Sequence, residues 1–310
     1  MLNCSNSLPS SEDQMKGLSN AEIALMVILN IVAIATYAIF FELWNYLHNN
    51  IISDSIREKT LLVLGIFPVT TIVYQLGMFV PRAGTLVDFV AAVYACIALF
   101  VFFHLAINYL GGVTEAIDKL QYVDAALNVG PCCCCCMCLP KVRISRKAYR
   151  ILRIGILQTL ILQPLLQFIS TVLWADGNFD SEEVNPSNPL FYMKIMLNTS
   201  ALLSLYVFNL SLKAAFGIAE AGYHLKAKYA IIIIYIILSN LQPLILGCLA
   251  TYNVIPCVDL YPSKDRASKI DHHIKILEMF ILLLVSRKYY RKQMPESSPL
   301  YFENPLHTMP

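Results

Sequence analysis

Long apolar runs separated by short polar segments form the main pattern of this chain. A membrane-spanning helix needs about 20 mainly apolar residues, and seven runs come near that length. They cover residues 23–41, 61–80, 86–110, 154–175, 190–212, 229–255 and 270–285. The seventh is the most polar, because two histidines, a lysine and a glutamate lie inside it. We therefore expect an all-α, polytopic membrane protein with seven transmembrane helices.

Composition agrees with this expectation. The 310 residues are 57% hydrophobic and only 14% charged, whereas soluble domains carry about 25% charged residues. A net charge of +2 is too small to indicate a nucleic-acid partner. The first apolar run follows an acidic, polar leader and exceeds the 7–15 residues, roughly, of a signal-peptide core. We expect it to be retained as the first span.

The distribution of Lys and Arg predicts the orientation, because these residues concentrate on the cytoplasmic side. With the N-terminus outside, the inside segments hold 16 of the 23 basic residues, and the outside segments hold the other 7. The 16 are Arg57, Lys59, Lys119, Lys141, Arg143, Arg146, Lys147, Arg150, Arg153, Lys213, Lys226, Lys228, Arg287, Lys288, Arg291 and Lys292. The predicted domains are an extracellular tail at 1–20, a seven-span domain at 21–292 with a cysteine-rich cytoplasmic loop at 111–148, and a disordered cytoplasmic tail at 293–310.

Six of the ten cysteines fall within seven residues of that loop, at Cys132, Cys133, Cys134, Cys135, Cys136 and Cys138. Disulfides persist poorly in the cytoplasm, and zinc sites space their ligands as C-x₂₋₄-C. Cysteines near a membrane surface are candidates for S-palmitoylation. Basic residues at 141–147 follow, and these are attracted to anionic inner-leaflet lipids. We predict lipidation of all six, with metal binding and inert thiols as the alternatives.

Two further predictions concern segments outside the spans. Residues 111–131 have apolar positions at helical spacing, which indicates a short amphipathic helix that either lies on the inner membrane face or packs against the spans. Asn3 begins a glycosylation sequon on the predicted outer side. Cys4 and Cys257 are both predicted to lie outside, where they are able to pair.

Polar side chains inside the spans are costly in lipid and usually face the bundle interior or water. We propose a candidate substrate path from Asn108, Gln158, Gln163, Asn240, Gln242, His273 and Glu278. The alternative is that the amides join helices by hydrogen bonds, each worth about 1 kcal/mol or less in lipid. Lys275 and Glu278 are three residues apart, a spacing that allows them to pair on one helix face.

Enzyme signatures are absent from the sequence, which has no Gly-rich phosphate loop, no HExxH and no GxSxG. We therefore predict no catalytic residue, no metal site and no cofactor.

Seven motifs resemble the alpha subunit of the organic solute transporter family. They are GPCCCCC at 130–136, GILQ at 155–158, DGNFD at 176–180, AKYA at 227–230, LQP at 241–243, HHIKILE at 272–278 and SRKYYRK at 286–292. The chain is also similar to the wider seven-span transmembrane-184 group. Lys275 departs from the pattern, because the family position is usually apolar.

The resemblance implies an N-out, seven-span transporter for bile acids, steroid sulfates and similar amphipathic organic anions, working by facilitated diffusion or exchange. It implies a single-span beta-type subunit as partner, besides membrane lipids, and a plasma-membrane location, with endomembranes as the alternative. Homo-oligomer formation is left open. A membrane-organising or trafficking protein is the main alternative function, and a seven-span receptor is less favoured because the DRY-like and NPxxY patterns are missing.

Overall fold

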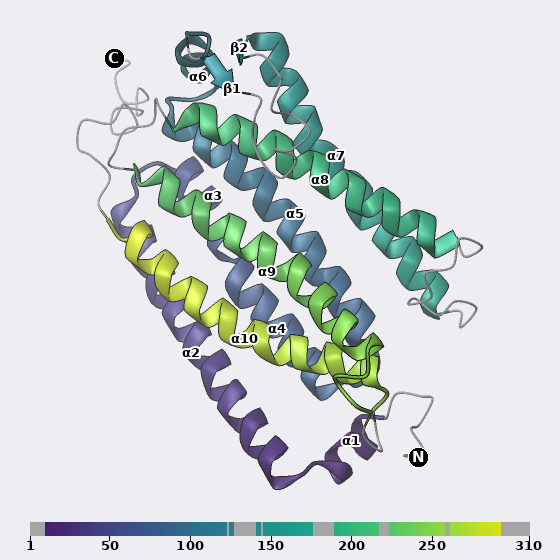
Figure 1. The fold of residues 1–310 in the computed structure, drawn as a ribbon. Coiled ribbons are helices and arrows are strands. Elements are labelled where there is room, and N and C mark those ends of the chain that lie inside the picture. The colour runs from purple at the N-terminus through teal and green to yellow at the C-terminus, as the bar shows by residue number, and fades with distance from the viewer. Residues whose placement is uncertain are drawn as a thin grey trace. The chain divides into compact units, whose positions relative to one another are not determined.

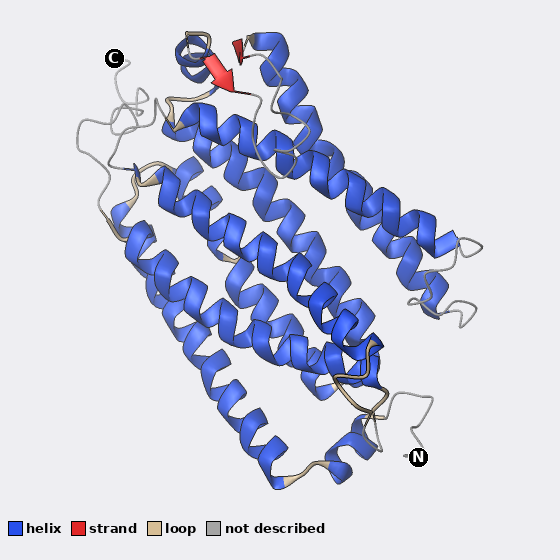
Figure 2. Ribbon diagram, in the orientation of Figure 1, coloured by secondary structure: helices blue, strands red, loops and turns tan. Residues whose placement is uncertain are grey.

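The computed structural model of this chain is built almost entirely from helices (Figure 2). It describes residues 10–122, 124–126, 141–143, 145–175, 189–216, 223–257 and 261–292. The helices are α1 (Ser11–Gly17), α2 (Asn20–Asn50), α3 (Asp54–Leu64), α4 (Ile66–Phe79), the 3₁₀ helix η1 (Pro81–Ala83), α5 (Gly84–Tyr109), α6 (Val113–Leu120), α7 (Arg146–Ala175), α8 (Pro189–Ala215), α9 (Leu225–Thr251) and α10 (Ser263–Tyr290). The predicted all-α class is confirmed. The described residues add one feature that the sequence did not predict, a pair of three-residue strands, β1 (Asp124–Ala126) and β2 (Lys141–Arg143).

Within the described ranges, six helical segments are long and apolar enough to cross a membrane. They are Asn20–Asn50, Asp54–Phe79, Pro81–Tyr109, Arg146–Leu173, Ile195–Ala215 and Leu225–Thr251, and they match the first six predicted spans. The seventh predicted span is also a helix, because it lies inside the 28 residues of α10. Because α10 carries several charged residues, it is not among the six segments that are apolar enough to cross a membrane. That α10 crosses the membrane therefore remains a prediction.

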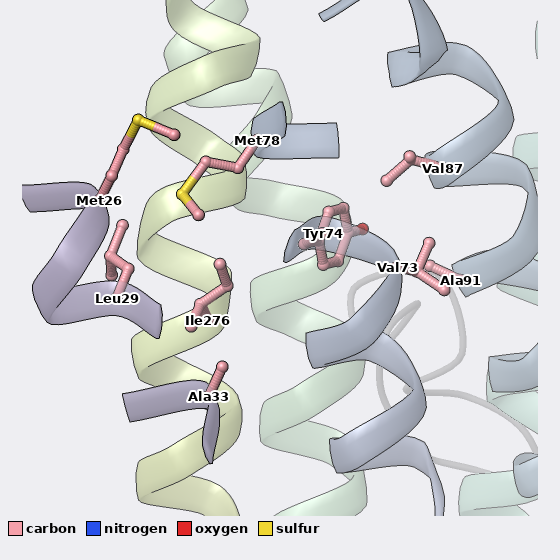
Figure 3. Packing of buried hydrophobic residues seen from close by; sticks show 9 residues of the cluster. All are labelled: Met26, Leu29, Ala33, Val73, Tyr74, Met78, Val87, Ala91 and Ile276. Carbon is pink, nitrogen blue, oxygen red and sulfur yellow. The ribbon is translucent and has the colours of Figure 1, made fainter. Parts of the chain in front are cut away.

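The chain folds into two compact units. The first comprises Met1–Tyr46, Leu64–Ala91 and Ala230–Arg291. It therefore contains α4 and α10 whole, most of α2 and α9, and the beginning of α5. Its apolar core joins α2, α4, α5 and α10 (Figure 3). The core residues are Met26, Leu29, Ala33, Val73, Tyr74, Met78, Val87, Ala91 and Ile276.

Amide side chains link α2 to α4 beside this core. The Tyr37 hydroxyl donates to Gln75 Oε1 at 2.8 Å, and Gln75 Nε2 donates to Asn30 Oδ1. Asn30 Nδ2 in turn donates to the Met26 carbonyl oxygen at 2.8 Å. Polar groups in apolar surroundings need such partners, because an unpaired group pays its full desolvation cost.

The short helix α1 belongs to the first unit as well. Ser10 and Asp13 form a capping box, in which the Asp13 backbone N–H donates to Ser10 Oγ at 3.2 Å. Gln14 is buried, and its Nε2 donates to the Met78 carbonyl oxygen at 3.1 Å. Part of the predicted N-terminal tail is therefore a capped helix held against the end of α4.

The second unit comprises Leu47–Val63, Ala92–Tyr229 and Lys292–Pro310. Its helices α7 and α8 lie side by side (Figure 1). A Cβ built on Gly155 lies 3.0 Å from Val207 Cγ2, so the missing side chain allows the close approach of α8. The Thr159 hydroxyl also donates to the Ser200 carbonyl oxygen at 3.3 Å.

The described part of the cysteine-rich loop contains α6 and the antiparallel pair of β1 and β2, with Ala125 opposite Val142. Ala116, Ile117 and Leu120 of α6 are buried. Of the two expectations for this helix, packing against protein is therefore the one that the structure shows. The six clustered cysteines lie outside the described residues, as do Asn3, Cys4 and the tail from residue 293.

Candidate functional site: a buried polar cluster around α10

Lys275 of α10 lies at the centre of a polar cluster within the first unit. Its side chain is buried, and Nζ lies 2.7 Å from Asp271 Oδ2. Nζ also donates to the Tyr74 hydroxyl at 3.0 Å and lies 4.7 Å from the centre of the Tyr74 ring. Residues four apart share a helix face, so Asp271 and Lys275 meet because of their spacing. Burying either charge alone would be strongly unfavourable, and pairing reduces this penalty.

Gln242 of α9 completes the surroundings of Asp271. Its Nε2 donates to Asp271 Oδ1 at 3.0 Å, while Lys275 occupies the other carboxylate oxygen. Both oxygens of this buried carboxylate therefore have donors, one from its own helix and one from α9. Of the residues predicted to form the candidate path, Gln242 is the one that enters this cluster.

His272 extends the cluster toward α5. The imidazole is 4% exposed, and its ring centre lies 4.9 Å from that of Tyr74. Its Nε2 lies 3.6 Å from Asp88 Oδ1, an ion-pair distance but longer than a hydrogen bond. A Cβ built on Gly77 of α4 lies 3.1 Å from His272 Nδ1. Glycine at position 77 therefore makes room for this imidazole.

The cluster joins four helices: α5 and α10 contribute ionisable side chains, and α4 and α9 contribute the neutral side chains of Tyr74 and Gln242. Two carboxylates, Asp88 and Asp271, face one ammonium group, Lys275. The sum is −1 when the His272 imidazole is neutral and zero when it is protonated. Among the described residues, no group of three or more His, Cys, Asp or Glu side chains is arranged to hold a metal ion. The interactions that the structure shows in the cluster are hydrogen bonds and ion pairs.

Two further sets of ion pairs connect α10 to α2, and the C-terminal ends of the two helices lie next to each other in Figure 1. Near the start of both helices, Lys269 Nζ lies 3.2 Å from Glu22 Oε1. Near their ends, Arg287 Nε lies 2.7 Å from Glu42 Oε2, and Arg291 Nη1 lies 3.1 Å from Glu42 Oε1. All three pairs involve partly exposed side chains, so they fix the position of α10 more than they stabilise it.

Tyrosines accompany these ion pairs at both ends. Lys269 Nζ lies 4.7 Å from the ring centre of Tyr261, which precedes α10. Burial, together with nearby Glu22 and Asp265, raises the pKa of the Tyr261 phenol to about 12, so this group stays neutral. At the other end Arg291 lies 4.6 Å from the ring centre of Tyr46, whose hydroxyl donates to the Arg291 carbonyl oxygen at 2.8 Å.

The sequence is similar to those of known proteins, and this similarity identifies the family of the chain. The family model described as "Organic solute transporter Ostalpha" matches residues 24–294 of the chain. The chain belongs to the organic solute transporter Ostalpha family. It is 32% identical to the organic solute transporter subunit alpha of Danio rerio, over 94% of this chain and 88% of that protein. It is 29% identical to the Homo sapiens subunit alpha, over 94% of this chain and 85% of that protein.

A more distant relative in this family is the organic solute transporter alpha-like protein 2 of Caenorhabditis elegans. It is 22% identical, over 92% of this chain and 84% of that protein. No solved structure gave a significant match. The chain is therefore a multi-pass membrane protein of a transporter family, and the relatives named as alpha subunits indicate that such a transporter has another subunit.

Within this member of the Ostalpha family, the other candidate path residues are distributed over both units. In the first unit His273 and Glu278 are half-buried on α10, and their Nε2 and Oε2 atoms have no hydrogen-bond partner among the described residues. Asn240 is exposed and donates to the Ile236 carbonyl oxygen at 2.7 Å. Lys275 pairs with Asp271 rather than with Glu278, the partner that the three-residue spacing also allows.

In the second unit, Asn108 Nδ2 donates to Ser55 Oγ at 3.4 Å. Gln158 Nε2 and Gln163 Oε1 are buried without a hydrogen-bond partner among the described residues. The structure thus gives a structural role to Asn108 and leaves two amides of α7 with polar atoms to satisfy. The assignment of all seven residues to one substrate path remains a prediction.

Proposed function

We propose that this chain is the alpha-type subunit of a transporter that moves amphipathic organic anions, such as bile acids, steroid sulfates or similar lipids, by facilitated diffusion or exchange. The single observation that carries the proposal is the family match over residues 24–294. The relatives are named as transporter subunits and align with most of this chain. We further propose a plasma-membrane location and a single-span beta-type partner.

The ion pairs between α2 and α10 support seven spans. Twenty residues separate Glu22 from Glu42 and eighteen separate Lys269 from Arg287, which at 1.5 Å per residue gives about 30 Å and about 27 Å. The hydrocarbon core of a bilayer is about 30 Å thick. This agreement supports a position of the Glu22 pair near one membrane surface and of the Glu42 pairs near the other.

A disulfide supports the N-out orientation. Cys257, in the segment between α9 and α10, is disulfide-bonded, and such bonds persist on the oxidising side of a membrane. With that segment outside, α10 runs inward, and the 16 basic residues lie in the cytoplasm. The cysteine run at 132–138 then faces the cytoplasm, where acylation takes place.

Unsatisfied polar atoms in each unit, taken separately, support a contact of some predicted residues with solute. Buried polar groups normally have hydrogen-bond partners, yet Gln158, Gln163, His273 and Glu278 each have a buried polar atom without one among the described residues. A solute with a polar head and an apolar body is able to supply such partners in passing. We assign these four side chains as the first to test.

Uptake of radiolabelled steroid sulfate into proteoliposomes, with and without a beta-type partner, tests the proposal. Glu278→Gln should lower uptake, because it replaces an ionisable group in the proposed path. Glu58→Gln, the same change at an exposed position on α3, should not. If the Glu278→Gln and Glu58→Gln variants take up steroid sulfate equally well, Glu278 is not part of the solute path. If no amphipathic anion is taken up by proteoliposomes, with or without the beta-type partner, the proposed transport function is wrong. If the protein's function in cells is lost only when the cysteines at 132–138 are replaced by serine, a trafficking role is favoured.

A further inference from the structure

The C-terminal ends of α2 and α10 carry an excess of positive charge. Arg287 Nε and Arg291 Nη1 share one carboxylate, that of Glu42, at 2.7 Å and 3.1 Å. Lys288, the residue after Arg287, is exposed. Three bases and one acid sum to +2, and all four residues belong to the first unit. This end of the unit therefore attracts anions.

Both guanidinium groups are held in place and keep donors for a ligand. A guanidinium has five N–H donors, and Glu42 accepts from a single nitrogen of each arginine. The Arg291 guanidinium also lies 4.6 Å from the centre of the Tyr46 ring, and the Tyr46 hydroxyl donates to the Arg291 carbonyl oxygen at 2.8 Å. The planar fork of arginine matches the oxygen atoms of phosphate and carboxylate groups. A headgroup that carries either group therefore fits this end.

An exposed apolar stripe on α10 leads to these bases. Leu277, Ile281 and Leu284 form the stripe and are 39%, 57% and 41% exposed. Lys288 continues the same row at helical spacing. The helix rises about 16 Å from residue 277 to residue 288, and half of the hydrocarbon core of a bilayer is about 15 Å thick. The stripe therefore has the length of an acyl chain in one leaflet, with the bases at the level of the headgroups.

We propose that the C-terminal ends of α2 and α10 bind one acidic phospholipid. Its headgroup contacts Arg287, Lys288 and Arg291, and one of its acyl chains lies along the α10 stripe. A soluble anion fits only the bases, and a zwitterionic lipid leaves the charge of +2 without compensation. With the N-terminus outside, as proposed above, this end faces the cytoplasmic leaflet, where acidic lipids lie. The site is independent of which solute the protein transports.

Native mass spectrometry tests the site, because it resolves the lipids bound to one protein molecule. The full-length chain is purified in detergent, together with any partner subunit that copurifies. It is titrated with dioleoylphosphatidylserine or with dioleoylphosphatidylcholine, which has the same acyl chains and no net charge. The wild type should bind the first phosphatidylserine molecule at least about fivefold more tightly than phosphatidylcholine, the effect expected of one base near an anionic lipid.

Lys288→Gln is the informative variant, because it removes a charge and leaves both ion pairs of Glu42 in place. It should weaken phosphatidylserine binding about fivefold and leave phosphatidylcholine binding unchanged. Lys213→Gln is the matched control, since it removes an exposed lysine from the last turn of α8, on the same predicted side of the membrane. The control should leave the affinity for both lipids unchanged.

The α10 stripe is tested by a second variant. Leu284→Gln should weaken the binding of both lipids, because their acyl chains are the same. Leu202→Gln, which changes an exposed leucine of α8, should weaken neither. If Leu284→Gln leaves both affinities unchanged, no acyl chain lies along the stripe and the proposed site is wrong.

Three further results would overturn the site. One is equal affinity of the wild type for the two lipids. Another is an equal loss in Lys213→Gln and Lys288→Gln, which would mean that any basic surface of the protein attracts acidic lipid. The third is phosphatidylserine binding that disappears when the partner subunit is present, which would assign the stripe to that subunit. The uptake assay described above is separate, so a chain that takes up steroid sulfate without selecting phosphatidylserine loses the lipid site and keeps its proposed function.

Discussion

Lys275 Nζ and Asp271 Oδ2 lie 2.7 Å apart on one face of α10, with both side chains buried. The pair is the reason that a helix with so many charged residues has a place in a membrane-protein core. Each buried charge is compensated by the opposite charge of the other residue. Tyr74 accepts a hydrogen bond from Lys275, and Gln242 donates one to Asp271. Removing one partner is therefore expected to be worse than removing both.

Lys275→Met should lower the free energy of unfolding by about 3–5 kcal/mol, the usual effect of leaving one member of a buried ion pair alone. Asp271→Leu should have a similar effect. The double variant should recover most of the loss, because well-packed apolar residues often replace a buried pair without penalty. Thermal unfolding of the detergent-purified protein measures all three. A double variant less stable than either single one would show that the pair is needed for more than charge balance.

Gly77→Ala should destabilise the first unit. The added methyl group would lie 3.1 Å from His272 Nδ1 and 3.2 Å from Val87 Cγ2, so α4 or the imidazole must shift. Overpacking of this kind costs about 1–3 kcal/mol. Gly247→Ala on α9 is the matched control, because nothing lies within 4 Å of its built Cβ. The control should be neutral or stabilising, since alanine favours a helix over glycine by about 1 kcal/mol. Equal melting temperatures for the two variants would contradict the close contact.

Gly155→Ala should weaken the packing of α7 on α8, because its Cβ would lie 3.0 Å from Val207 Cγ2. Val207→Ala shortens the side chain that the new methyl group meets. The double variant should therefore be more stable than Gly155→Ala alone. Thermal unfolding again gives the result, and additive losses would mean that the two positions do not touch.

Cysteines introduced at either end of α10 test whether it crosses the membrane. Lys264→Cys and Lys288→Cys place thiols on exposed positions, in a background whose accessible native cysteines are replaced. A membrane-impermeant maleimide added to intact cells should label position 264 directly and position 288 only after permeabilisation. Labelling of both positions in intact cells would leave α10 on one side of the bilayer.

Lipid attachment to the six clustered cysteines, Cys132–Cys136 and Cys138, remains a prediction, because they lie outside the described residues. Hydroxylamine cleaves thioesters, so it should release acyl groups from the wild-type protein and none from a variant with serine at all six positions. The measurement is the mass of the intact protein before and after treatment. A mass that does not change in the wild type would leave metal binding or unmodified thiols as the explanation.

The spans could be predicted because their signal is local. Runs of about 20 apolar residues give a helix whatever lies beside it, so six predicted spans agree with the described helices. Residues 270–285 give a weaker signal, because charged residues interrupt the apolar run. The helix there is real, and its ion pairs with α2 explain how it has a fixed position despite its charges.

The cluster around Lys275 could be predicted only in part. The sequence allows Lys275 to pair with Asp271, four residues before it, or with Glu278, three residues after it, and spacing alone does not decide between them. Tyr74 and Gly77 lie in an apolar run with nothing to distinguish them from their neighbours. Which residue of α4 faces α10 depends on how the helices pack, and packing is a property of pairs of helices rather than of either sequence.

The polarity of α10 has a consequence for how the protein is made. An Asp, Lys or Arg at the centre of a spanning helix opposes insertion by about 2.5–3.5 kcal/mol, so α10 is poorly suited to enter the bilayer alone. It is also synthesised after all the other described helices. Glu22 and Glu42 on α2, Tyr74 on α4 and Gln242 on α9 are therefore already in place when it emerges. α10 therefore packs onto a helix that was made much earlier, and a nascent chain stopped before residue 263 would expose the carboxylates of α2 without the basic residues that pair with them.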